Sequence, residues 1–171
     1  MKKRKIHATM LVLLLAISFL QSFSQTIEVS AGQTLFPGLY GGLRYAHPTN
    51  SELNIAGGLF LESSNQHNLR YRCFGLDLLA QYSSDRENEN VFSFKTSLGT
   101  SLQIENEPWV YKDWGIPQKI NYGLIGELQG VINLTDAFSI SAFGQQKFLF
   151  NKILGTTHFI FGLGLSYKLG L

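Results

Sequence analysis

Alternation of apolar and polar residues with a period of two is the feature that most constrains this chain of 171 residues. In the segment 156–170, Phe159, Phe161, Leu163 and Leu165 fall on one face of an extended strand, while Gly, Ser, His and Lys fall on the other. A period of two is typical of β-strands, whereas an amphipathic helix repeats its apolar residues every three to four positions. We find no convincing helical period after Thr26, so the chain is predicted to be all-β.

Clusters of Pro, Gly, Asn, Asp and Ser, which favour turns, divide the pattern into eight segments. The predicted strands cover about residues 26–33, 38–46, 52–62, 69–82, 91–105, 119–133, 136–150 and 156–170. The seventh is the least regular because Gly144 and Gln146 fall on its apolar side, and we expect a β-bulge or a change of register there. An even number of strands favours a closed antiparallel up-and-down barrel with both chain ends at the same end.

The composition of the polar face indicates which face of the strands lies outside. A soluble barrel or sandwich turns its apolar face inward and its polar face to water. Here the polar face is rich in Gly and Ser with isolated charges of both signs, and small residues suit the crowded interior of an eight-stranded barrel. Aromatic residues gather near the predicted strand ends, as in the girdles of membrane barrels. The sequence therefore favours an eight-stranded antiparallel transmembrane β-barrel over a soluble β protein.

This orientation places a set of charged side chains inside the barrel. The predicted lumenal charges are Glu28, Arg44, Asp77, Lys95, Glu127, Lys147 and Lys168, with Glu52 and Glu62 nearer the strand ends. Unpaired charges in a low-dielectric interior are costly, so we expect a paired network that plugs the barrel. The alternative is a narrow pore in which water solvates these groups. Cys73 falls on the same lumenal face and is interpreted as a small buried residue.

The first 24 residues have the features of a signal peptide. Basic residues at positions 2–5 precede an apolar run from Ala8 to Leu20, and Ser22 and Ser24 are small residues suited to cleavage before Gln25. The alternative is a membrane-anchor helix, but the run is shorter than the ~20 residues that span a bilayer. We therefore expect residues 1–24 to direct export and residues 25–171 to form one barrel domain in outer-membrane lipid.

Removal of this segment changes the charge balance of the chain. The segment holds four of the 14 Lys and Arg residues and none of the 12 Asp and Glu residues, which leaves 10 basic and 12 acidic side chains and a net charge of −2. We find no basic patch of the kind that binds nucleic acid, so no direct binding to nucleic acid is expected.

The predicted topology identifies one candidate contact loop. With both chain ends in the periplasm, the loops near 34–37, 63–68, 105–118 and 151–155 point outward, and the third is the longest. Trp109, Tyr111 and Trp114 in this loop are candidate contact residues, because exposed aromatic side chains are common in interfaces. The alternative is that the tryptophans pack on the barrel rim or lie among lipid headgroups.

Residues that would carry catalysis or bind a metal are dispersed. His47, His67 and His158 show no metal-ligand spacing, and the Gly-rich pairs lie within strand patterns and not in a phosphate-binding loop. His158 with Ser139 or Ser141 is one arrangement that a lipid-modifying enzyme could use, but a single His at the start of a strand is more often structural. We expect no enzymatic activity, no metal and no cofactor.

The last three predicted strands and the loop before them carry a family resemblance. The motifs are Asn121-Tyr122-Gly123, Gly126-Glu127-Leu128, Asn133-Leu134-Thr135-Asp136, Gln145-Gln146-Lys147-Phe148-Leu149 and the run from His158 to Lys168 that contains Phe161-Gly162-Leu163-Gly164. Together they resemble the TraO family of Bacteroidetes conjugative transposons. The chain departs from that family on the seventh strand, where Gln145 and Lys147 stand in place of a frequent Arg.

The resemblance implies an outer-membrane component of a conjugative DNA-transfer apparatus that works with other transfer proteins. An eight-stranded barrel is too narrow to pass DNA, so the implied role is non-catalytic, as a structural or anchoring element. The residues by themselves leave two alternatives open. One is a small porin-like or adhesive barrel unrelated to conjugation, and the other is the lipid-modifying enzyme.

Overall fold

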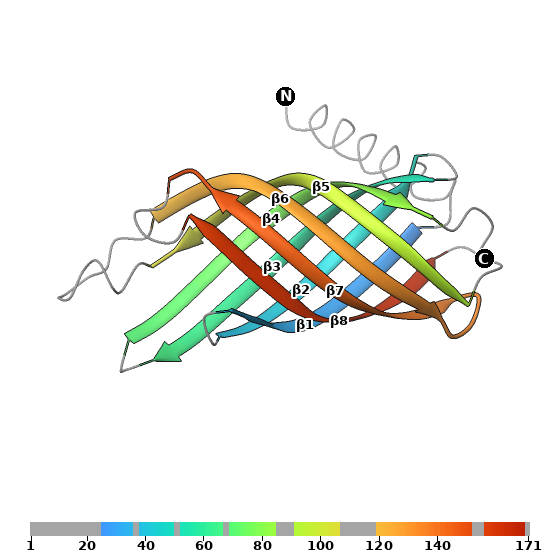
Figure 1. Ribbon diagram of the computed structural model, residues 1–171, viewed down its shortest axis with the longest axis horizontal. Coiled ribbons are helices and arrows are strands. Elements are labelled where there is room, and N and C mark those ends of the chain that lie inside the picture. The colour runs from blue at the N-terminus through green and yellow to red at the C-terminus, as the bar shows by residue number, and fades with distance from the viewer. Residues whose placement is uncertain are drawn as a thin grey trace, which may run out of the picture.

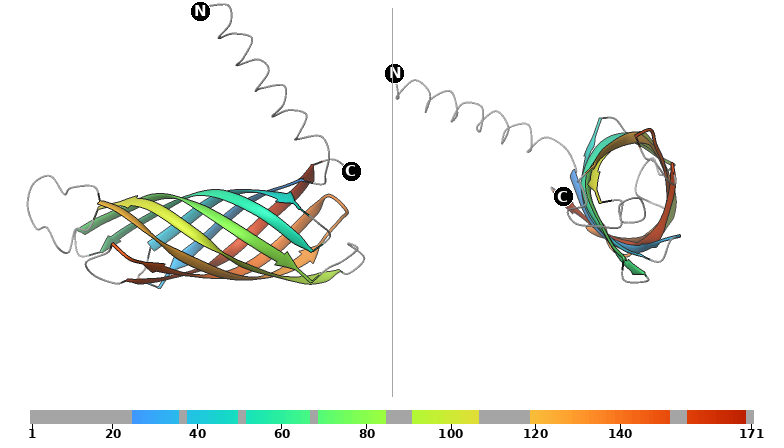
Figure 2. Two further views of the ribbon diagram at one scale, coloured as in Figure 1. Left: turned by 90° about the horizontal axis from the view of Figure 1, so that it is seen from above. Right: turned by 90° about the vertical axis from the view of Figure 1, so that its left-hand side faces the viewer.

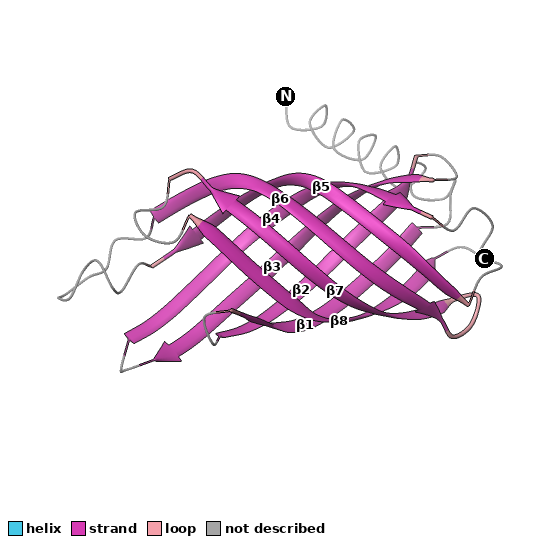
Figure 3. Ribbon diagram, viewed as in Figure 1, coloured by secondary structure: helices cyan, strands magenta, loops and turns pink. Residues whose placement is uncertain are grey.

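The computed structural model describes residues 25–35, 38–49, 52–66, 69–84, 91–106, 119–151 and 156–169, which fold into β-strands and turns (Figure 3). The strands are β1 Gln25–Thr34, β2 Gly38–Pro48, β3 Leu53–Gln66, β4 Leu69–Ser83, β5 Phe92–Glu105, β6 Lys119–Asn133, β7 Phe138–Leu149 and β8 Thr157–Leu169. Each predicted strand is found, with ends that shift by a few residues at most. Among the described residues we find no helix with the length and apolar character needed to cross a bilayer. The predicted signal peptide lies outside the described residues.

The eight strands form one closed antiparallel barrel in sequence order (Figures 1 and 2). Closure is made by β1 and β8, which pair from Gln25 opposite Leu169 to Thr34 opposite Ile160. In the end-on view of Figure 2 the strands make a complete ring. A closed ring leaves no unpaired strand edge, and this is the condition for a sheet to lie in lipid. The predicted eight-stranded up-and-down barrel is confirmed.

The two ends of the barrel carry different connections. The connections β1–β2, β3–β4, β5–β6 and β7–β8 lie at one end, which we call the loop end. The connections β2–β3, β4–β5 and β6–β7 lie at the other end together with Gln25 and Leu169, and we call this the terminus end. The β6–β7 turn is tight: the Leu134 and Thr135 backbone amides both donate to the Phe138 carbonyl, at 2.9 and 3.1 Å.

The outer face of the wall is apolar and the inner face is polar, which is the reverse of a soluble barrel. In β5, Leu98 is 68% exposed and Leu102 is 50% exposed, whereas Ser97 and Ser101, which directly precede them, are buried. Removing one Leu side chain from water is worth about 1.5–3 kcal/mol, so an outer surface built this way is stable in contact with lipid and not with water. The predicted assignment of the two faces is confirmed.

Aromatic side chains on the outer face gather at both ends of the strands. Toward the terminus end the ring centroids of Phe138 and Tyr167 lie 4.9 Å apart, and Phe92 packs edge-on against its neighbour Phe94 at 4.7 Å. Toward the loop end the ring of Tyr122 on β6 lies 6.0 Å from that of Phe150. Two belts of this kind mark the interfaces of the membrane in transmembrane barrels.

The expectation of an irregular β7 is wrong. Its pairing with β6 and with β8 is continuous across Gly144 and Gln146, without a bulge or a change of register. Both residues lie on the lipid side, as the alternation requires, and each is half-buried. Gln146 Nε2 donates to the backbone carbonyls of Lys147 at 3.1 Å and His158 at 3.2 Å, while the ring of Phe159 covers Gly144. Because the Gln146 amide is hydrogen-bonded and the Phe159 ring covers Gly144, both residues fit on the outer face without a bulge.

The interior also holds large apolar side chains. The rings of Tyr40 and Phe60 stack with centroids 6.1 Å apart, and Phe143 meets Tyr40 edge-on at 5.9 Å. Gly75 makes room for this cluster, because a Cβ added there would overlap the Phe60 ring. The lumen is therefore packed by aromatic rings as well as by polar groups.

Candidate functional site: the polar lumen

The first group of lumenal charges centres on Arg44 of β2. Its two terminal nitrogens each donate to one carboxylate oxygen of Glu127 on β6, both at 2.6 Å. The same guanidinium lies 3.6 Å from Glu28 of β1. Because β2 and β6 are four strands apart in a ring of eight, this bidentate pair joins opposite walls of the barrel.

Neutral polar side chains complete this first group. Gln129 Nε2 donates to Glu28 at 2.7 Å and to Ser141 Oγ at 2.9 Å. Ser166 donates to Glu28 at 3.1 Å, and Gln145 donates to Glu127 at 3.0 Å. In addition to the contact with Arg44, Glu28 therefore accepts two hydrogen bonds and Glu127 accepts one, which helps to compensate the loss of water around these buried charges.

The second group joins β3, β4 and β7. The Lys147 ammonium, which is fully buried, lies 3.2 Å from both carboxylate oxygens of Asp77. It also lies 3.2 Å from the centre of the Phe60 ring, which is close enough for a cation–π interaction. Since β3 and β7 are opposite strands, this group crosses the lumen as the first one does.

A third group lies nearer the loop end and contains two carboxylates. Nε2 of His158 lies 2.7 Å from a carboxylate oxygen of Glu62. Glu105 accepts hydrogen bonds from Tyr71, Asn121 and Gln103. Our sequence interpretation placed Glu105 at a loop boundary and missed its role, although it continues the inward alternation of Ser101 and Gln103.

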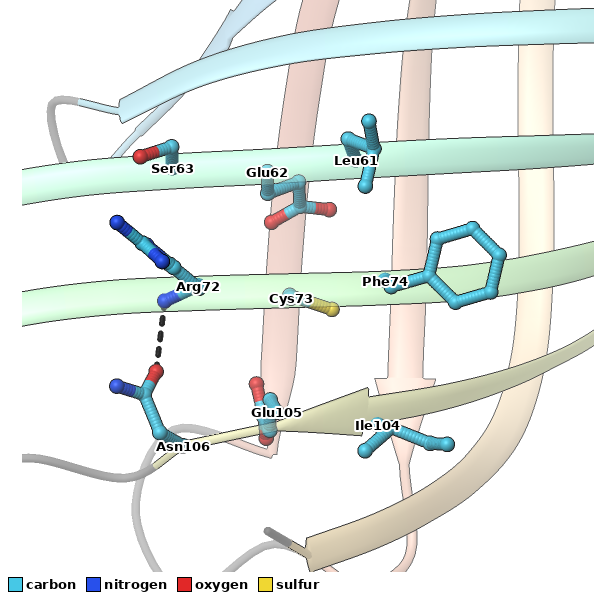
Figure 4. Close-up of a pocket in the computed structure, with 9 residues that line it drawn as sticks. All are labelled: Leu61, Glu62, Ser63, Arg72, Cys73, Phe74, Ile104, Glu105 and Asn106. Carbon is cyan, nitrogen blue, oxygen red and sulfur yellow. Dashed lines mark hydrogen bonds between the residues drawn. The ribbon is translucent and has the colours of Figure 1, made fainter. Parts of the chain in front are cut away.

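A pocket of about 680 Å³ adjoins this third group at the loop end of β3, β4 and β5 (Figure 4). Its lining combines the inward side chains Glu62, Cys73 and Glu105 with residues of the outer face and rim. These are Leu61, Ser63, Arg72, Phe74, Ile104 and Asn106. The three inward side chains that line the pocket are buried, and for Cys73 this agrees with the expectation from the sequence.

The seven predicted lumenal charges occupy different places in this arrangement. Glu28, Arg44, Asp77, Glu127 and Lys147 are buried and belong to the first two groups. Lys95 and Lys168 lie toward the terminus end and are half-buried, outside those groups. The candidate contact residues Trp109, Tyr111 and Trp114 lie outside the described residues, so their prediction stays a prediction.

The described residues do not assemble the serine–histidine arrangement considered from the sequence. His158 pairs across the β7–β8 ladder with Lys147, and Ser141 lies six residues further along β7. At ~3.3 Å per residue that separation is about 20 Å. In the part of the chain that the structure describes, no three His, Cys, Asp or Glu side chains are placed to hold a metal ion.

Comparison with known proteins supports the fold. No protein-family model matches the chain, and no curated protein matches its sequence. Among solved structures, the chain is similar to the N-terminal β-barrel domain of Pseudomonas aeruginosa OprF, with a TM-score of 0.65 and 14% identity over 85% of this chain and 97% of that one.

Two further structures show that this fold is used by proteins of different kinds. Ail, the attachment invasion locus protein of Yersinia pestis, has a TM-score of 0.56 and 12% identity over 85% of this chain and 97% of that one. The outer-membrane enzyme PagL has a TM-score of 0.55 and 9% identity over 84% of this chain and 99% of that one. At these identities the likeness assigns an architecture and not an activity. The chain thus has the fold of small eight-stranded outer-membrane barrels, and its candidate site is a lumen crossed by two charged groups.

Proposed function

We propose that this protein is a non-conducting, non-catalytic barrel of the outer membrane that anchors other components of a conjugative DNA-transfer apparatus. The observation that supports the non-conducting part is the bidentate contact between Arg44 and Glu127, which joins opposite walls of the lumen. The Lys147–Asp77 pair and the ring of Phe60 obstruct the lumen a second time. The link to conjugation is supported by the resemblance of the last three strands to the TraO family.

An anchoring role fits the distribution of functional groups in the barrel. In the first two groups, the buried charges are paired with one another across the lumen. A rigid, filled barrel offers its loops and turns as the surfaces available to partners. The partners would then be other transfer proteins, held at the outer membrane without passing anything through the lumen.

Conductance measurements test the first half of the proposal. Purified protein in planar bilayers is expected to show no resolved single-channel steps in 1 M KCl. The double variant Arg44→Ala with Glu127→Ala removes the ion pair that joins the opposite walls of β2 and β6. It is expected to raise the conductance if the Lys147 group does not close the lumen by itself. Large, regular steps from the wild-type protein would contradict a plugged barrel.

A smaller conductance would indicate a wetted path through the lumen. The hydroxyls of Ser97 and Ser101 and the Gln145 Oε1 atom are buried without a hydrogen-bond partner in the structure. Groups of this kind are commonly bonded by internal water. Small, ohmic currents in the wild-type protein would therefore favour the narrow-pore interpretation of the lumen.

Mating frequency tests the second half of the proposal. A donor that lacks only this gene is expected to transfer DNA several orders of magnitude less often, and the wild-type gene is expected to restore transfer. As a matched control, the OprF barrel domain exported with residues 1–24 of this chain supplies the same fold with different loops. Restoration by that control would contradict a specific anchoring role.

The second candidate function is a surface barrel with an adhesive or porin-like role unrelated to conjugation. It is favoured by the similarity in fold to Ail, the attachment invasion locus protein. Unchanged mating together with reduced attachment of the deletion strain to surfaces or host cells would support this alternative over the anchoring role.

A further inference from the structure

On the outer face of the strands, the side chains that the structure describes include two charged ones, and they are neighbours. Arg70 and Arg72 on β4 are exposed and point outward, between the buried inward residues of the same strand. Of the side chains that the structure describes within the strands, these are the only Lys, Arg, Asp or Glu on the outer face. Neither forms an ion pair with a described carboxylate.

The two arginines lie at the level expected for the membrane interface. The outward residues that follow them along β4 are Phe74, Leu76, Leu78, Ala80 and Tyr82. An apolar band in a transmembrane barrel is about 25 Å tall, and tilted strands rise ~3.3 Å per residue along their length. The ten steps along the strand from Tyr82 to Arg72 therefore cover approximately the whole band, with Arg72 at its edge and Arg70 just beyond it.

An arginine at this level is tolerated in lipid. On the lipid face of a barrel it costs about 2–4 kcal/mol at the midplane but about 0–1 kcal/mol near the interface, where the guanidinium reaches the headgroups. The exposed ring of Phe74 follows Arg72 on the outer face of β4, and Tyr122 of the aromatic belt lies toward the same end of the barrel. Figure 4 shows Arg72 on the rim side of Phe74, at the loop end of β4.

Asn106 holds the backbone that carries these arginines. The ladder between β4 and β5 ends at Cys73 opposite Glu105, and the Asn106 side chain continues it. Its Oδ1 accepts from the Arg72 amide at 2.6 Å, and its Nδ2 donates to the Arg70 carbonyl at 2.6 Å. The strand end therefore stays extended, which keeps the two side chains on one face and about 7 Å apart at their bases.

We propose that Arg70 and Arg72 form a binding site for the phosphate groups of anionic lipid headgroups in the leaflet around the loop end. Guanidinium groups bind phosphate with two parallel hydrogen bonds, and anionic headgroups attract cationic side chains at a membrane surface. In the orientation expected from the sequence, this leaflet is the outer one. The neutral polar residues Ser63 and Asn65 of β3, which pair with Arg72 and Arg70 respectively, extend the polar surface of the site.

Selectivity of the surrounding lipid shell tests this site. Protein is folded into phosphatidylcholine vesicles that contain a trace of spin-labelled phosphatidylglycerol or spin-labelled phosphatidylcholine, and the immobilised fraction of each label is measured. The wild-type protein is expected to prefer phosphatidylglycerol two- to three-fold. R70Q/R72Q is expected to lose this preference, and R70K/R72K, which keeps the charge without the bidentate geometry, to retain part of it.

Control variants test whether the two arginines themselves produce the lipid preference. L128A, which changes the outer face of β6 away from the site, is expected to keep the wild-type preference, and each single Arg→Gln variant is expected to lose about half of it. Far-UV circular dichroism establishes that each variant has folded. An unchanged preference in R70Q/R72Q would overturn the proposal. Inorganic phosphate, but not chloride at equal ionic strength, is expected to lower the wild-type preference, because both arginines bind the phosphate group. Saturable binding of inorganic phosphate by a wild-type protein that shows no preference for phosphatidylglycerol would identify a free-phosphate site and overturn the assignment to lipid.

Discussion

The two faces of the barrel wall are built from alternate residues of the same strands, yet they carry different side chains. On the inner face, charges from opposite walls meet, as Arg44 and Glu127 do. On the outer face of the described strands, Leu, Ile, Phe and Val prevail, and the charges are confined to Arg70 and Arg72 near one end. A charged side chain is therefore tolerated in this wall where an oppositely charged partner or a lipid headgroup compensates its loss of water.

Breaking the inner pairing is expected to have the largest effect. Arg44→Met leaves Glu127 and Glu28 buried without their cation, which typically costs about 3–5 kcal/mol. The free energy of unfolding in phospholipid vesicles, from guanidinium titration followed by circular dichroism, measures this loss. The triple variant R44M/E127L/E28Q removes the charges together and is expected to recover most of the stability. Equal losses in both variants would mean that the pairing contributes nothing specific.

Moving a charge to the outer face tests the other side of the comparison. Leu128 follows Glu127 directly in β6 but faces lipid and is 67% exposed. Leu128→Arg near the middle of the wall is expected to lower the free energy of unfolding in vesicles by about 2–4 kcal/mol. Leu128→Ala is the control for lost apolar contact and is expected to cost much less. If Leu128→Arg were neutral, Leu128 could not lie at the centre of a lipid-facing band.

An added methyl group is expected to destabilise the barrel more on the inner face of the wall than on the outer face. Gly75→Ala places a methyl group against the Phe60 ring and the Leu102 carbonyl, so the free energy of unfolding should fall by about 1–3 kcal/mol. Gly57→Ala is the matched control, because a Cβ added there meets only Leu78, at 3.7 Å. A similar effect of the two changes, measured by the same titration, would show that the interior near Phe60 is loosely packed.

The smallest effect is expected at the position where the sequence pattern looked irregular. Gln146→Leu removes hydrogen bonds to the Lys147 and His158 carbonyls, both of which lie within a sheet, and adds apolar surface facing lipid. These two changes oppose each other, so the free energy of unfolding should stay within about 1 kcal/mol of the wild-type value. A larger loss would mean that the side-chain amide of Gln146 is needed to hold β7 against β8.

The alternation of residues within each strand was sufficient to predict which side chains line the inner and outer faces of the barrel wall. Because successive side chains of a strand point to opposite faces, the positions of Ser97 and Leu98 were fixed by alternation before any strand was paired. The same rule indicated that Lys147 points inward and Phe148 outward, and the structure agrees. Where the prediction failed, at Gly144 and Gln146, the deciding facts were a hydrogen bond and a covering ring from β8, which a one-strand pattern does not contain.

The sequence by itself determined that the chain forms eight strands, which residues face inward and that the apolar face meets lipid, since each follows from a period of two and from side-chain chemistry. Only the tertiary structure decided which inward groups meet. Arg44 and Glu127 are 83 residues apart in sequence, and Lys147 and Asp77 are 70 apart. Their contacts depend on closure of the ring and on the register of each of the strands between them. Register and closure are properties of the whole sheet, so no segment of the sequence contains them.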